Sequence, residues 1–170
     1  MSTSTFKAVI LAGGSGERFW PLSTPERPKQ FLRVFGGASL IRQAVSRLDG
    51  LVLPKDVFVV TAKNLVAATQ KELPEIPKCN ILGEPMRRDT GAAVALGVGL
   101  AAGSAADPVI GFFSSDQMVA NPKAFRKVYR GFLQPAALWH LFRRNLFNFA
   151  FYYRGLRYLI GHLLDFKGSK

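Results

Sequence analysis

The sequence has almost no cysteine and comparatively few acidic side chains. Its single cysteine is Cys79, which excludes an internal disulfide framework and a cysteine-rich zinc site. That residue is expected to be a small buried side chain. No stretch approaches the roughly 18 uncharged apolar residues that cross a bilayer, and residues 1–6 lack the basic and apolar regions of a secretory signal. We therefore expect a cytoplasmic chain without a transmembrane span.

The residues that are present suffice for one folded domain. The chain has 170 residues, of which 48% are hydrophobic, and this length and composition are typical of a single globular domain. Lysine and arginine number 23 against 11 aspartates and glutamates, which gives a net charge of +12. This excess of positive charge favours ligands or surfaces that carry negative charge.

Charge and aromatic residues change abruptly near Arg130. Residues 1–130 carry a net charge of +7 and 10 aromatic side chains, whereas residues 131–170 alone carry +5 and a further 10. We therefore predict a domain over residues 1–130 and a basic aromatic tail over residues 131–170. Apolar side chains recur at helical spacing across residues 138–164, which predicts an amphipathic helix in the tail.

Three explanations of the tail stay open. It is an aberrant end in which the native continuation after about Arg130 has been lost, or an amphipathic helix on an anionic membrane surface, or a helix that covers the sheet edge or joins a partner. Homo-oligomerisation is also left open. Nucleic-acid binding is not expected, because no recognisable reading motif accompanies the charge.

Strands and helices are expected to alternate within residues 1–130. Short apolar runs predict four strands, over Phe6–Leu11, Val57–Thr61, Cys79–Leu82 and Val109–Phe113. Helical spacing and capping residues predict helices over Ser39–Leu48, over Asn64–Leu73, from Asp89 or Thr90 to Ala102, and from Asn121 to about Tyr129. Gly97 and Gly99 are expected to let the third of these helices pack closely on the sheet. The pattern predicts an α/β fold with a doubly wound, mostly parallel, Rossmann-like sheet.

The segment after the first predicted strand has the composition of a phosphate-binding loop. Gly13, Gly14 and Gly16 leave the backbone open to a ligand, and successive N–H groups can form a nest for phosphate oxygens. Arg18 and Lys29 add the positive charge that a triphosphate requires. The segment is neither a Walker loop nor a dinucleotide fingerprint. A tight turn with two solvated cations is the alternative.

Residues 11–32 resemble the signature of the sugar-1-phosphate nucleotidyltransferases. The run Arg27-Pro28-Lys29-Gln30-Phe31 is closest to the mannose-1-phosphate guanylyltransferases of that family. Two later segments are similar to blocks of the same subfamily: residues 83–90 (GEPMRRDT) resemble its Glu-Pro-x-x-Arg-Asn-Thr block, and residues 114–117 (SSDQ) its Pro-Ser-Asp-His block. Asp89, Ser114 and Gln117 depart from those patterns. The resemblance covers about residues 5–130 and implies that family's nucleotidyltransferase fold.

The resemblance implies the reactants and the residues that act on them. GTP and a hexose 1-phosphate, here mannose 1-phosphate, would give GDP-mannose and pyrophosphate without a protein nucleophile. Arg18 and Lys29 would neutralise charge together with Mg²⁺. Asp116 would hold the Mg²⁺, with a turn cap as the alternative role. The implied nucleotide-binding residues are Leu11, Ala12, Gly13, Gly14, Ser15, Gly16, Glu84, Arg88 and Thr90.

Two of these residues have an alternative role. Glu84 could instead be a solvated loop carboxylate, and Arg88 could face solvent.

The family's sugar-binding region and second metal carboxylate have no counterpart in this sequence, so the chain is expected to be an N-terminal part that is incomplete or inactive by itself. The rival class is a non-catalytic nucleotide-binding or membrane-surface protein that uses the tail.

Overall fold

Four parallel strands form the sheet of the computed structural model, which describes residues 6–14, 16–34, 36–86, 90–103 and 108–131. The strands are β1 (Phe6–Ala12), β2 (Val57–Ala62), β3 (Ile81–Glu84) and β4 (Val109–Ser114). Their order across the sheet is β3-β2-β1-β4, and each neighbouring pair is parallel. The predicted α/β fold with a parallel sheet is confirmed.

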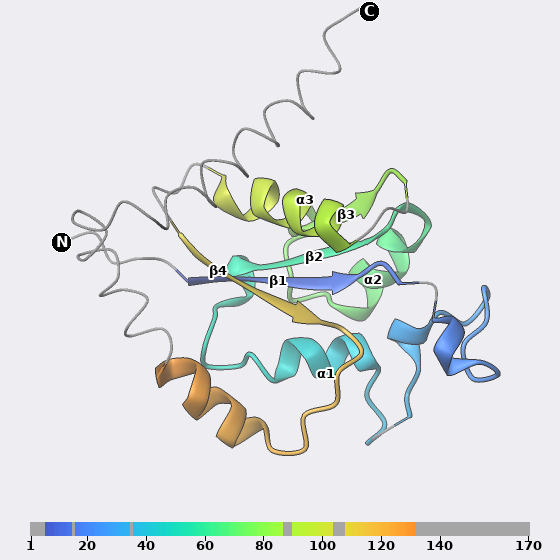
Figure 1. Cartoon of the computed structure of the whole chain (residues 1–170), viewed down its shortest axis with the longest axis horizontal. Helices are drawn as coiled ribbons and strands as arrows, with labels where there is room; N and C mark the ends of the chain where they lie inside the picture. The colour runs from blue at the N-terminus through green and yellow to red at the C-terminus, as the bar shows by residue number, and fades with distance from the viewer. Residues whose placement is uncertain (1–5, 15, 35, 87–89, 104–107, 132–170) are drawn as a thin grey trace, which may run out of the picture.

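Helices cover both faces of this sheet (Figure 1). Helix α3 (Thr90–Ala102) lies on one face, whereas α1 (Leu40–Ser46) and the helix over residues 122–131 lie on the other. Helix α2 (Val66–Glu72) contacts β2 and β3. Coverage on two sides explains why β1 and β2 consist of nearly continuous apolar residues, because each strand must bury both of its faces.

Two apolar clusters, one on each side of the sheet, hold the layers together. On the α1 side, Ile10 and Val59 pack against Ile41, Val45 and Leu48. On the α3 side, the buried residues are Val9, Phe58, Val60 and Ala101. Alternate residues of β1 therefore enter opposite clusters, which fixes the register of the strand.

Helix termini follow the sequence signals. Ser39 accepts a hydrogen bond from the backbone N of Arg42 at 3.2 Å and so caps α1. Asn121 accepts one from the backbone N of Ala124 at 3.0 Å, directly before the helix that begins at Pro122. Both predicted caps are confirmed.

The close approach of α3 to the sheet depends on one of the two glycines. A Cβ at Gly97 would lie 2.7 Å from Val9 Cγ1, whereas a Cβ at Gly99 would meet nothing within 4 Å. Gly97 is therefore the contact that lets the helix sit against β1, and the same expectation for Gly99 is wrong.

The third strand lies two residues later than predicted. Lys78–Asn80 form a 3-10 turn after Pro77, so the strand begins at Ile81 and continues through Glu84. Cys79 consequently lies in the turn and is exposed, which corrects its expected burial. Glu84 becomes a buried strand residue, 7% exposed, and is not a solvated loop carboxylate.

Residues 132–170 lie outside the described residues. The predicted tail helix over residues 138–164 and the boundary near Arg130 therefore stay predictions. Within the part of the chain that the structure describes, no helix is both long enough and apolar enough to cross a membrane.

Candidate active site

The order of the strands places two predicted segments beside each other. From β1 the chain proceeds outward through β2 to β3, and it then returns to place β4 on the opposite side of β1. Ligands of open α/β sheets bind outside the carboxyl ends of the strands at such a reversal. The glycine segment, defined by Gly13, Gly14 and Gly16, follows β1. Asp116 follows β4, so both lie at this reversal.

The glycine segment makes close contacts with two charged side chains. A Cβ at Gly13 would collide with the Glu84 carboxylate, and a Cβ at Gly14 would lie 2.9 Å from Lys29 Nζ. Gly16 has a positive φ of 79°, and a Cβ there would lie 3.0 Å from Lys29 Cβ. A side chain at any of these three positions would press on Glu84 or Lys29, so the packing, as well as any ligand, favours glycine there.

Lys29 and Asp116 form an ion pair between the 3-10 turn over residues 29–31 and the turn that follows β4. Lys29 Nζ donates to Asp116 Oδ2 at 2.5 Å, and the two side chains are 17% and 24% exposed. Ser114 Oγ donates to the other carboxylate oxygen. Burial raises the pKa of Asp116, but the hydrogen bonds from Lys29 and Ser114 outweigh burial and hold this pKa below its ordinary value. Asp116 is therefore ionised near neutral pH.

Short local elements hold these two groups in place. Lys29 begins a 3-10 turn over Lys29–Phe31, whose next residue, Gln30, is fully buried. Ser115 is also buried, and its backbone N donates to the backbone O of Leu11 at 3.1 Å. This bond continues the pairing of β1 with β4 beyond the last strand residue. The turn that carries Asp116 is thereby fixed against the end of β1.

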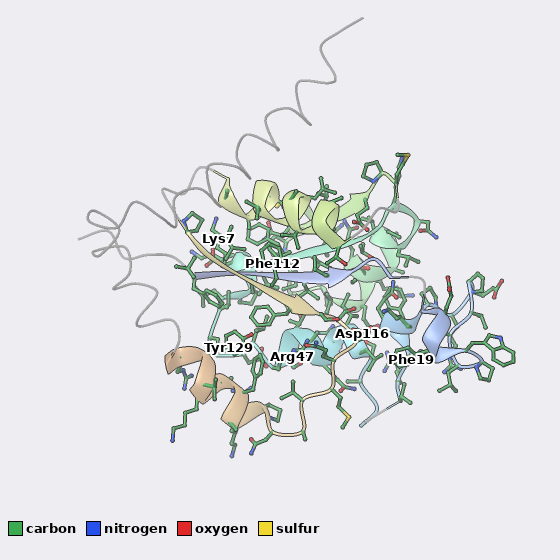
Figure 2. All side chains as sticks on the ribbon, in the orientation of Figure 1. Lys7, Phe19, Arg47, Phe112, Asp116 and Tyr129 are labelled. Atoms are coloured by element: carbon green, nitrogen blue, oxygen red, sulfur yellow. The ribbon has the colours of Figure 1, made fainter. Side chains whose placement is uncertain are left out.

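Arg47 contacts the same turn from beneath. Its Nη1 donates to the backbone O of Gln117 at 2.6 Å, and its Nη2 donates to the backbone O of Ser114. Figure 2 shows this side chain between α1 and the end of β4, near Asp116. The sequence analysis did not select it. The available signal was its position seven residues after Leu40 and three after Ala44, on the apolar face of the helix.

An open pocket of about 540 Å³ adjoins Glu84 at the ends of β2 and β3. Its lining residues are Ala62, Lys63, Asn64, Glu84, Pro85 and Met86. Glu84 both lines this pocket and lies against Gly13, and the lining combines apolar side chains with an amide and two charged groups. Such a lining can pack against an apolar ring of a ligand and form hydrogen bonds with its polar groups.

The predicted site residues fall into three groups. The structure brings together Gly13, Gly14, Gly16, Lys29, Glu84 and Asp116, with Leu11 and Ala12 at the end of β1 beneath them. Thr90 begins α3 and is exposed, and no described contact links it to this group. Arg18 lies in the 3-10 turn Glu17–Phe19, but its side chain, together with Ser15 and Arg88, lies outside the described part.

The donor set at Asp116 fits a magnesium ion that takes one carboxylate from the protein and most of its other oxygens from a bound phosphate compound and water. The described residues contain no group of three or more histidine, cysteine, aspartate or glutamate side chains that could enclose a metal. Mg²⁺ commonly takes only one or two carboxylates from the protein and its other oxygens from phosphates and water. An ionised, partly exposed carboxylate beside a phosphate-type loop meets that requirement.

Known proteins are similar to this chain over most of its length. A family model described as "Nucleotidyl transferase" matches residues 7–139. A mannose-1-phosphate guanylyltransferase of Klebsiella pneumoniae is 35% identical over 135 residues, which are 78% of this chain and 28% of that protein. The corresponding protein of Escherichia coli K12 is 34% identical, over 76% of this chain and 28% of its own length. The chain thus spans less than a third of these relatives.

Solved structures agree with the sequence matches. A structure from Thermus thermophilus, titled mannose-1-phosphate geranyltransferase, has a TM-score of 0.70 and 34% identity and matches 78% of this chain and 38% of its own. A putative glucose-1-phosphate thymidylyltransferase of Bacillus anthracis, at 20% identity with a TM-score of 0.59, shares the fold. From the family match and the arrangement of the strand ends, this chain belongs to the nucleotidyl transferase family.

Proposed function

We propose that this chain binds the triphosphate of GTP at the carboxyl ends of β1, β3 and β4 and serves guanylyl transfer to mannose 1-phosphate. The observation that carries the proposal is one continuous cluster of groups. Gly13 and Gly14 lie against Glu84 and Lys29, and Lys29 is paired with Asp116. A bare backbone, a cation and an ionised carboxylate are the three components that a metal-bound triphosphate needs.

Each component has a distinct task in this proposal. The backbone N–H groups around Gly13 and Gly14 would donate hydrogen bonds to phosphate oxygens, because no side chain stands in their way. The ammonium of Lys29, together with Arg18, would neutralise the charge that develops on the leaving pyrophosphate. Asp116 would hold Mg²⁺, which when bound supplies further neutralisation of the phosphate oxygens.

The reaction requires no nucleophile from the protein. A phosphate oxygen of mannose 1-phosphate forms a bond to the α-phosphorus of GTP, while the bond from that phosphorus to the bridging oxygen breaks. Pyrophosphate departs with the electron pair of the broken bond. The tasks of this chain are then positioning and electrostatic stabilisation, which dominate catalysis of phosphoryl-type transfers.

The pocket beside Glu84 is the proposed place of the nucleoside. Glu84 lines this pocket and also lies against Gly13, so a triphosphate on Gly13 and Gly14 could extend its sugar and base past Glu84 toward Lys63, Asn64 and Pro85. Guanine is proposed from the names of the relatives, which are guanylyltransferases. Mannose 1-phosphate is proposed on the same ground.

Calorimetric titration of GTP into the full chain with Mg²⁺ tests the binding step. Lys29→Ala and Arg18→Ala should each weaken binding by about tenfold or more, since each removes a charge-assisted hydrogen bond. The matched control is Lys55→Ala: Lys55 is exposed and precedes β2, at the opposite end of the sheet. Equal and negligible affinity in the wild type and both site variants would contradict the proposal.

Transfer is tested separately from binding, because the chain spans only 28% of the guanylyltransferases it matches. The full chain is incubated with GTP, Mg²⁺ and mannose 1-phosphate, and the release of pyrophosphate and GDP-mannose is followed. Glucose 1-phosphate in place of mannose 1-phosphate tests the sugar. Turnover with glucose 1-phosphate alone would contradict the proposed acceptor while leaving the triphosphate site intact.

A further inference from the structure

Arg47 is a charged side chain in the interior, at the end of α1. It is 5% exposed, and its buried Nε has no hydrogen-bond partner among the described residues. Burial lowers the pKa of the guanidinium, while the influence of Tyr129 and Asp116 partly opposes this effect. Taking a cation out of water is costly unless specific contacts compensate for it.

The compensating contacts converge on one turn of the chain. The two terminal nitrogens of Arg47 donate to the backbone oxygens of Ser114 and Gln117, at 2.6 Å for Gln117. These two carbonyl groups flank Ser115 and Asp116 in the sequence. A single planar guanidinium thus spans the turn that presents the Asp116 carboxylate.

Aromatic side chains complete the surroundings of this arginine. The guanidinium carbon lies 5.9 Å from the centre of the Phe125 ring. Phe125 packs in turn against Phe113 and Tyr129, with ring centres 6.2 and 4.5 Å away. Figure 2 shows Tyr129 on the helix that closes this side of the molecule. Arg47 itself is 5% exposed, so the donor end of both hydrogen bonds is shielded from water, and a hydrogen bond in such surroundings is stronger than one in water.

We propose that Arg47 is a positioning residue for Asp116, and that its two bonds to the carbonyls of Ser114 and Gln117 hold the carboxylate where a magnesium-bound triphosphate needs it. This inference rests on the proposed function. The described hydrogen bonds of Arg47 go to the backbone and not to the carboxylate, so this side chain acts through the turn.

The two carbonyl groups set a requirement that an apolar side chain does not meet. Methionine would fill the space under Phe125 without the desolvation cost of a cation, but it would leave the oxygens of Ser114 and Gln117 without these donors. Lysine would keep the charge, but a single ammonium lacks the fork that reaches two carbonyls at once. The feature that only arginine supplies is the fixed separation of its two donors.

The test measures the dissociation constant of GTP for the full chain with Mg²⁺ and with EDTA. The value in EDTA divided by the value in Mg²⁺ gives the gain in GTP affinity that Mg²⁺ provides. In Arg47→Met, we expect this ratio to fall about tenfold, as for other groups that orient a metal ligand, while the EDTA value changes less than about threefold. Arg47→Lys should fall between Arg47→Met and the wild type. A purely structural role would alter both dissociation constants alike and leave the ratio unchanged.

Arg130→Met is the matched control. Arg130 is an exposed arginine that also bonds to a backbone carbonyl, that of Gly50 at 3.1 Å, on the segment that follows α1. It links the helix over residues 122–131 to the segment after α1, and it makes no described contact with the turn at Asp116. Its ratio should equal that of the wild type.

Each other outcome overturns the inference. A wild-type ratio in Arg47→Met, or equal losses with and without Mg²⁺, contradicts the positioning role directly. If circular dichroism shows Arg47→Met to be unfolded, Arg47→Lys decides by the same ratio, and unfolding of both assigns Arg47 to the fold as a whole. A wild-type chain that binds GTP without a gain from Mg²⁺ contradicts the role of Asp116, and one that binds no GTP contradicts the proposed function.

Discussion

Replacing Gly14 by alanine should separate ligand binding from stability. An added Cβ would lie 2.9 Å from Lys29 Nζ and 3.1 Å from Lys29 Cε, so the end of the lysine must retreat by about 0.5 Å to reach an ordinary contact of 3.4 Å. That movement acts directly on the 2.5 Å contact with Asp116. Because the affected atoms are the flexible end of one side chain, the surrounding core need not move.

The expected stability change is small. Gly14 does not have a positive φ, so alanine fits the backbone. Alanine also lowers the conformational entropy of the unfolded chain, which stabilises the fold by about 0.4–1 kcal/mol. This gain should roughly offset the weakened Lys29 contact, since a partly exposed ion pair contributes about 0–1 kcal/mol. Urea unfolding should therefore place the Gly14→Ala variant within about 1 kcal/mol of the wild type.

The expected change in GTP binding is large. A misplaced Lys29 loses a charge-assisted hydrogen bond to phosphate worth about 1.5–3 kcal/mol. This loss raises the dissociation constant of GTP by roughly tenfold to hundredfold. Calorimetric titration of GTP with Mg²⁺ measures it, and Gly99→Ala is the control because a Cβ there meets nothing within 4 Å. Wild-type affinity in the Gly14→Ala variant would refute the assignment of Lys29 to the triphosphate.

Two further predictions concern stability. Because the pKa of Asp116 is lower in the folded chain, its charge stabilises the fold fully above about pH 5, and this contribution disappears as the pH falls below about 4. The difference in unfolding free energy between the wild type and Asp116→Asn should therefore shrink in acid, and a difference that grows there would contradict the pairing with Lys29. Gly97→Ala should destabilise the chain by about 1–2 kcal/mol in urea, since the new Cβ would lie 2.7 Å from Val9 Cγ1. Gly99→Ala, on the same helix, should instead be neutral or stabilising, and equal behaviour of the two variants would contradict the close contact of α3 with β1.

The sequence was sufficient to predict the elements whose signals are local. The apolar run of β2 and the capping residues Ser39 and Asn121 predicted the correct elements, because strand burial and helix capping depend on neighbouring residues. The third strand was predicted two residues early, since nothing in the apolar pattern distinguishes Cys79 and Asn80 in a 3-10 turn from the start of a strand. Burial of Glu84 followed from the same shift.

The site could be predicted in part. Resemblance and spacing selected Lys29 and Asp116, but their direct contact joins residues 87 positions apart and depends on the sheet order. Arg47 was missed because its partners are backbone carbonyl groups, which leave no trace in residue type. A charged residue on the apolar face of a short helix is the one signal that would have drawn attention to it.

The pairing of β1 with β4 has a consequence for how the site comes into being. Residues 6–11 are matched with residues 109–114, so the two halves of the proposed triphosphate site come from opposite ends of the described chain. Contacts so distant in sequence form late in folding, after the loops between them have closed. During synthesis, β1, β2 and β3 are available before β4 has been synthesised. At that stage Lys29 cannot form its ion pair with Asp116. Nucleotide binding should therefore begin only when the chain has emerged past residue 117, which makes it a marker for completion of this sheet.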